Sequence, residues 1–131
     1  MILTDRVALE ELAAEVVDGA FKVHRELGPG LLESAYQACL THVLLKRSVP
    51  VRCEVLLPLI FDGARVDAGY RIDMIVADSI LVENKAVQAL APVHQAQLLT
   101  YLKLSGLNLG FLINWNVHRL KDGIRRVVYR L

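Results

Sequence analysis

The sequence predicts an α/β sandwich, in which a central mixed β-sheet is flanked by helices. Apolar residues recur at helical spacing in two segments before residue 48 and again over 93–104. Between and after these segments, short apolar runs are separated by turn residues such as Asp62-Gly63. The predicted order is two helices, three strands, one helix and two strands, which suggests helices packed against a mixed sheet.

The length and composition are those of one folded domain. The chain has 131 residues, so we expect a single domain over residues 1–131. Its apolar fraction of 54% provides a sizeable core without disulfides or metal staples. Cys39 and Cys53 form no CxxC pair, and we expect both to be buried, reduced thiols.

Charge and hydropathy limit the classes of partner. The formal net charge of +1 excludes a strongly basic nucleic-acid binder judged by overall charge, but not a local basic surface. The acidic, amphipathic first residues lack the pattern of a signal peptide, and no apolar run is long enough to span a membrane. The sequence therefore predicts a soluble cytoplasmic protein without a membrane segment.

Two helices are expected first. Thr4 or Asp5 can cap a helix that runs to about Glu26, and Gly28-Pro29-Gly30 ends it because both residue types break helices. A second helix is expected from about Leu32 to Arg47. The predicted apolar positions of the two helices are Leu9, Leu12, Ala13, Val16, Val17, Ala20, Phe21, Ala35, Tyr36, Cys39, Leu40, Val43 and Leu44.

The remaining segments predict strands and one more helix. Pro92 introduces the third helix and Gly106 ends it, whereas Asp78-Ser79 is expected to turn the chain between two strands. Lys121-Asp122-Gly123 is a second turn signal. The expected strands are 51–60, 70–76, 80–86, 109–115 and 124–129.

Charged residues interrupt two neighbouring apolar strands. Because strand side chains alternate, Arg71 and Asp73 should share one face of their strand, with Ile72 and Met74 on the other. On the next strand Glu83 and Lys85 should share a face, opposite Val82, Asn84 and Ala86. Antiparallel pairing would bring Asp73 near Glu83 and Lys85.

This arrangement has two interpretations. Two carboxylates that converge repel each other unless a cation lies between them, and a hard cation such as Mg²⁺ prefers oxygen ligands. Lys85 could then orient a water or stabilise charge on a phosphate. The alternative is a ladder of ion pairs on an exposed sheet face. Spacing alone leaves both open.

Further motifs accompany these residues in a fixed order. Gly30, Glu33 and Tyr36 form G-x-x-E-x-x-Y, and Gln97 and Tyr101 form Q-x-x-x-Y. The segment 110–115, Gly-Phe-Leu-Ile-Asn-Trp, ends the fourth strand. Together with Asp73 and Glu83-Asn84-Lys85, these motifs resemble the GxxExxY family of PD-(D/E)XK nuclease-like proteins over residues 23–128.

The resemblance implies a PD-(D/E)XK nuclease-like α/β sandwich and a metal centre. It implies that Asp73 and Glu83 bind Mg²⁺ or Mn²⁺, that Lys85 is the catalytic lysine, and that Glu33 supplements the metal site. Gln97 matches a helical residue that flanks the active site, where it could hydrogen-bond a metal ligand or a substrate phosphate.

Two further residues have alternative roles, and a third departs from the family pattern. Tyr101 is either a core residue or a contact for a substrate phosphate, and Arg71 either neutralises Asp73 or binds a phosphate. Asn84 stands where the family usually has an apolar residue. Since it should face the core, it needs a hydrogen-bond partner there.

The function that the resemblance implies is divalent-metal-dependent hydrolysis of phosphodiester bonds in DNA, with RNA as the other substrate. The alternatives are a non-catalytic module that binds nucleic acid or protein, and a subunit of a larger assembly. A homodimer is compatible with cutting both strands of a duplex. The basic C-terminal residues are either a solvated face or a phosphate-contacting edge: Arg119, Lys121, Arg125, Arg126 and Arg130.

Overall fold

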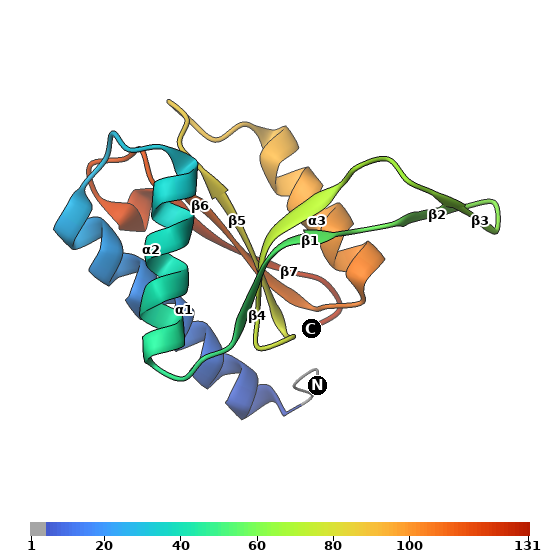
Figure 1. Ribbon diagram of the computed structural model, residues 1–131, viewed down its shortest axis with the longest axis horizontal. Coiled ribbons are helices and arrows are strands. Elements are labelled where there is room, and N and C mark those ends of the chain that lie inside the picture. Colours follow the sequence, from blue (N-terminus) through green and yellow to red (C-terminus); the bar gives the residue numbers. More distant parts are fainter. Residues whose placement is uncertain (1–4) are drawn as a thin grey trace.

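The structure is a computed structural model that describes residues 5–131, and it confirms the predicted α/β architecture (Figure 1). A five-stranded mixed sheet of order β1-β4-β5-β6-β7 lies between α1 and α2 on one face and α3 on the other. Among the strands of the described residues, only β5 and β6 pair in parallel, and α3 connects them. The elements are α1 (Arg6–Leu27), α2 (Glu33–Lys46), β1 (Val51–Leu56), β2 (Leu59–Phe61), β3 (Ala64–Val66), β4 (Arg71–Val76), β5 (Ile80–Lys85), α3 (Pro92–Ser105), β6 (Leu109–Asn114), η1 (Leu120–Asp122) and β7 (Ile124–Val128).

The helix boundaries follow the predicted signals. The Asp5 carboxylate caps α1 by accepting the Val7 N–H at 2.9 Å, whereas Thr4 lies outside the described residues. Gly28 and Gly30 separate α1 from α2 with φ of 66° and 105°, a region that favours glycine. Within residues 5–131, no helix has the length and apolar content needed to cross a bilayer.

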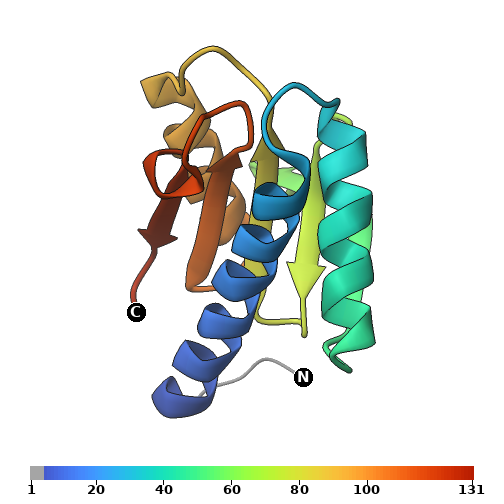
Figure 2. The ribbon, with the colours of Figure 1, turned by 90° about the vertical axis from the view of Figure 1, so that its left-hand side faces the viewer.

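Two hydrophobic cores hold the layers together. Trp115, Tyr36 and Leu40 are fully buried in the core between the sheet and the α1–α2 layer. Figure 2 shows α1 and α2 on the same side of the sheet. Leu81 and Leu98 are fully buried between the opposite face and α3. Because both faces are covered, β4 through β6 are apolar except where the candidate site interrupts them.

The predicted continuous strand over 51–60 is wrong. β1 ends at Leu56, and the chain leaves the sheet through Leu57 and Pro58, whose ring carries no N–H for a ladder. It then forms the two-stranded β2–β3 hairpin, which we call the arm, around the predicted Asp62-Gly63 turn. Figure 1 shows the arm projecting from the body of the molecule.

Side-chain alternation along β4 also departs from the prediction. Met74 packs on the α1–α2 side, but Ile72 packs on the α3 side, so the two do not share a face. The irregularity coincides with Glu54, which lies on β1 between the bonded pairs Cys53–Met74 and Val55–Ile72 and has a φ of 54°. A left-handed residue in a strand twists the local ladder and re-aims its side chains.

Two smaller expectations are corrected. The turn between β4 and β5 is formed by Ala77 and Asp78, both at positive φ, and closes through the Ser79 N–H bond to Val76 O at 2.9 Å, one residue earlier than predicted. Cys53 is exposed and Cys39 half-buried, because α2 and β1 lie at the edge of the sandwich.

Candidate metal centre

Asp73 and Glu83 meet where the β4–β5 ladder ends. The last bonded pair is Met74–Val82. Beyond it, the Glu83 carboxylate accepts the Asp73 N–H at 3.0 Å, and the Asp73 carboxylate accepts the Asn84 N–H at 2.8 Å. Each acid thus holds the backbone of the opposite strand, which confirms that the hairpin brings the two carboxylates together.

The pKa values of both carboxyl groups are raised. Burial, followed by the charge of Asp73, raises the pKa of Glu83 to about 8. Burial also raises the pKa of Asp73, with Glu54 and Glu33 adding to the rise, while the Asn84 N–H bond lowers it. Glu83 is only 4% exposed, so a solvated ladder of ion pairs does not describe this site.

The backbone of Lys85 is held by hydrogen bonds within the sheet, and its amine forms no ion pair with the described residues. It pairs with Asn114 in the parallel β5–β6 register, and its carbonyl accepts the Trp115 N–H at 2.9 Å. The positive charge of Lys85 lowers the pKa values of both Asp73 and Glu83. Among residues 5–131, however, no carboxylate lies within 4.0 Å of its amine.

The turn before α2 places Glu33 at the end of β5. The Tyr36 hydroxyl donates to Gly28 O at 2.5 Å and accepts the Leu31 N–H at 3.1 Å, which ties the turn to the helix. Glu33 then reaches the sheet, where its carboxylate accepts the Ala86 N–H at 3.1 Å. The G-x-x-E-x-x-Y spacing therefore lets Tyr36 hold the turn before α2 while Glu33 contacts the end of β5.

Asn84 has the buried partners that its position requires. Its side-chain oxygen accepts the Trp115 indole N–H at 2.9 Å, and its amide donates to Gln37 at 3.2 Å. The Trp115 ring stacks on Tyr36 with centroids 4.9 Å apart. Gln37 in turn donates to the Glu54 carboxylate at 2.9 Å. A continuous network thus links the α1–α2 core to the acidic end of the sheet.

We expect Asn84→Leu to lower the free energy of unfolding by about 2–3 kcal/mol, because it leaves the buried Trp115 indole N–H without an acceptor. Urea denaturation measures this change. Trp115→Phe in the same chain removes the orphaned donor, so the double variant should be more stable than the sum of the two single changes indicates. A single variant within about 0.5 kcal/mol of the parent would contradict the network's role.

The α3 side of the site carries Gln97 and Tyr101. The Gln97 amide donates to the Tyr101 hydroxyl at 3.0 Å. Tyr101 is 4% exposed, and its pKa is raised first by burial and then by the charges of Glu83 and Asp73. α3 therefore lies near the acidic pair, and Tyr101 belongs to the core, with its hydroxyl hydrogen-bonded to Gln97.

Arg71 and Asp73 form no ion pair with each other. It is exposed at the first position of β4, and within the described part of the chain it forms no ion pair within 4.0 Å. Neutralisation of Asp73 by Arg71 is therefore not seen. A phosphate contact by Arg71 stays a prediction.

The sequence interpretation missed Glu54 and Gln37. Both line a hollow of about 400 Å³ beside α2, together with Glu33 and Asp73. One signal was present, because Glu54 interrupts the apolar pattern of β1 much as Asp73 interrupts β4.

Over residues 5–131, no three His, Cys, Asp or Glu side chains are arranged to hold a metal ion, so Glu33 does not complete a set with Asp73 and Glu83.

A helix-flanked mixed sheet with Asp73, Glu83 and Lys85 at the end of one hairpin is the architecture of a nuclease-like α/β domain. The family model of the PD-(D/E)XK nuclease superfamily matches residues 10–127, and the chain belongs to this superfamily. Its members generally use divalent metals. Neither the curated proteins nor the solved structures contain a match to this chain.

Proposed function

We propose that this protein is a divalent-metal-dependent nuclease that hydrolyses phosphodiester bonds in DNA, with RNA as the other substrate. The observation that carries the proposal is the meeting of Asp73 and Glu83 across β4 and β5, with the Lys85 amine two residues beyond Glu83. Membership of a nuclease superfamily supports it.

The donor set fits a hard cation. The backbone bonds occupy Glu83 Oε1 and Asp73 Oδ2, while Glu83 Oε2 and Asp73 Oδ1 accept no N–H from the backbone of residues 5–131. The pKa values of the buried Glu83 and the half-buried Asp73 are both raised, and binding of Mg²⁺ or Mn²⁺ would favour the ionised forms of both carboxyls. A bound divalent cation would supply Lewis-acid stabilisation of a phosphate and a more acidic water.

Other residues of the chain are assigned to water activation and to binding of the substrate phosphates. We assign Lys85 to the attacking water or to the charge that develops on the phosphate, since its amine forms no ion pair with any residue from 5 to 131. Glu33 orders the end of β5 and would reach the metal through water. Gln97, Tyr101 and Arg71 are assigned to the substrate phosphates that flank the scissile bond.

We also propose that the chain belongs to the GxxExxY branch of the superfamily. The support is structural as well as sequential. Tyr36 closes the turn that begins at Gly28, and Glu33 contacts the end of the strand that carries Lys85. The motif therefore connects the turn, α2 and the candidate metal site.

A panel of end-labelled DNA and RNA substrates, single-stranded and duplex, tests the proposal with Mg²⁺, Mn²⁺ or chelator present. Cleavage that requires metal is the expected result. Isothermal titration of Mn²⁺ into the parent and into Asp73→Asn should show binding to the parent only. A parent protein that neither cleaves any substrate nor binds metal would instead be a non-catalytic binding module.

A further inference from the structure

A second hollow adjoins the candidate metal centre on the α3 side. It has a volume of about 560 Å³ and lies between α3 and the base of the arm. We call it the α3 hollow. Its lining includes Gln97 and Tyr101, and the charges of Glu83 and Asp73 raise the pKa of Tyr101, so the hollow lies near the acidic pair. Its outer wall includes Leu59, Tyr70, Val93 and Leu104.

The chemistry of the α3 hollow suits an uncharged, flat group. No Asp, Glu, Lys or Arg lines it, and its polar groups are those of His94, Gln97, Thr100 and the tyrosines. A phosphate would find no cation there. An aromatic heterocycle, by contrast, would meet apolar walls and a few hydrogen-bonding groups, the usual lining of a small-ligand site.

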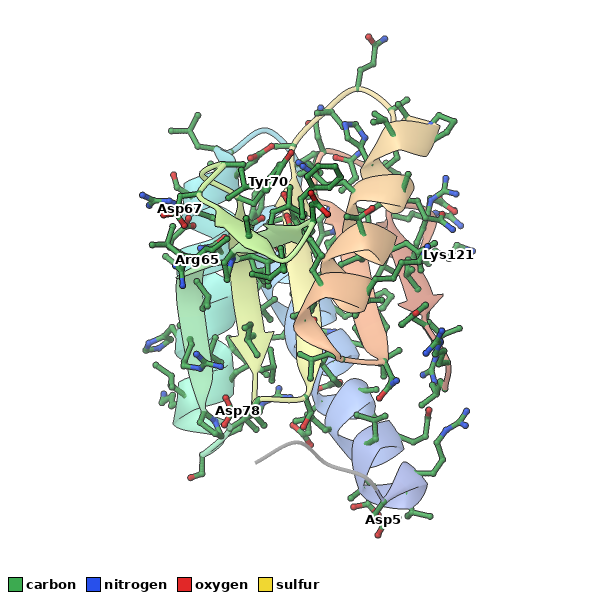
Figure 3. All side chains as sticks on the ribbon, turned by 90° about the vertical axis from the view of Figure 1, so that its right-hand side faces the viewer. Asp5, Arg65, Asp67, Tyr70, Asp78 and Lys121 are labelled. Carbon is green, nitrogen blue, oxygen red and sulfur yellow. The ribbon has the colours of Figure 1, made fainter. Side chains whose placement is uncertain are left out.

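Tyr70 provides an exposed aromatic face in this hollow. Its side chain lies beside the arm, facing α3, in Figure 3, and the residue is 41% exposed. The Tyr70 and Tyr101 rings have centroids 6.2 Å apart and planes inclined at 59°. Tyr101 thus supports one side of Tyr70, while much of Tyr70 is left uncovered. Exposed aromatic rings are the platforms on which unpaired bases stack.

We propose that the α3 hollow binds an unpaired nucleobase next to the scissile phosphate, so that the preferred substrate is single-stranded nucleic acid. This inference rests on the proposed nuclease function. In a duplex the faces of each base are covered by its neighbours, so a base can enter the hollow only when it is unpaired. The net charge of +1 adds little general attraction to duplex phosphates, which makes base contacts more important.

Binding of a labelled single-stranded DNA oligonucleotide, and of the same sequence as a duplex, tests the proposal in a Lys85→Ala background with Mg²⁺. Fluorescence anisotropy should show roughly tenfold tighter binding of the single strand. Tyr70→Ala should weaken single-strand binding about tenfold and leave duplex binding within about twofold. Because stacking involves no counterion release, the effect of Tyr70→Ala should be the same at low and high salt.

Two controls and a second variant make the result specific. Tyr70→Phe keeps the ring, and Tyr129→Ala removes a tyrosine that does not line the hollow, so both should bind the single strand like the background protein. Val93→Glu changes a residue that is 67% exposed, which protects the fold, and adds a negative charge to the hollow. It should weaken single-strand binding at least as much as Tyr70→Ala.

The outcomes separate the two proposals. Unchanged affinity in both Tyr70→Ala and Val93→Glu, with cleavage by the parent intact, overturns the base site alone. Binding that depends on Tyr70, without cleavage of any substrate by the parent, overturns the nuclease function alone. If Tyr70→Ala alters the sedimentation mass of the protein and not its affinity, the hollow is an interface with a second copy and the base site is wrong.

Discussion

Lys85→Ala is expected to reduce metal-dependent cleavage by about 10²–10³-fold, the usual cost of removing one group that stabilises charge in a transition state. The fold should be unaffected. Lys85 is only half-buried, forms no ion pair within 4.0 Å among residues 5–131, and is held by backbone bonds that alanine keeps. Single-turnover cleavage with saturating Mn²⁺ measures the effect on chemistry apart from product release.

A matched lysine outside the site makes this result interpretable. Lys46→Ala removes an equal charge from an exposed position in the last turn of α2 and should leave the cleavage rate unchanged. Lys85→Arg keeps the charge but replaces a compact ammonium by a planar guanidinium, so we expect it to restore only part of the rate. A Lys85→Ala protein that cleaves as fast as the parent would remove the lysine from the mechanism.

The sequence was sufficient to predict the layers and the acidic pair because both depend on local patterns. Helical spacing and the breakers Pro92 and Gly106 identified α3, and antiparallel pairing of two neighbouring strands placed Asp73 near Glu83. The need of Asn84 for a buried partner also followed from its place between Glu83 and Lys85. The structure confirms that need with Trp115 and Gln37.

The features that were missed depend on contacts between distant segments. Val51 through Ile60 is apolar enough for one strand, and only the exit at Pro58 divides it into β1 and the arm. The strict alternation expected around Asp73 fails because Glu54, on another strand, adopts a positive φ. The network from Trp115 to Glu54 joins residues far apart in the chain, which no local pattern reveals.

The second large effect expected is a loss of stability of the metal-free protein as the pH rises. Glu83 has an ordinary pKa of 4.5 and a folded-state pKa of about 8. Between these values the folded protein binds a proton that the unfolded chain releases, so the stability due to this group is complete below about 4.5 and is lost as the pH passes about 8. The raised pKa of Asp73 acts in the same direction.

The Glu83→Gln variant tests this pH dependence of stability, because it removes the charge of the side chain and keeps its shape. The amide oxygen of glutamine can still accept the Asp73 N–H, and its NH₂ can donate to the Asp73 carboxylate. With chelator present, urea denaturation across this pH range should show the parent losing a few kcal/mol relative to Glu83→Gln. Glu11→Gln, at an exposed position of α1, should follow the parent.

Divalent metal should reduce this loss of stability at high pH in the parent and should have little effect on the stability of the Glu83→Gln variant. A cation between Asp73 and Glu83 favours their ionised forms, so binding releases protons and its stabilising effect grows as the pH rises. Mg²⁺ or Mn²⁺ should therefore raise the stability of the parent most at alkaline pH and leave Glu83→Gln nearly unchanged. Equal stabilisation of both proteins would show that the metal binds elsewhere, because only the parent has a second carboxylate to offer opposite Asp73.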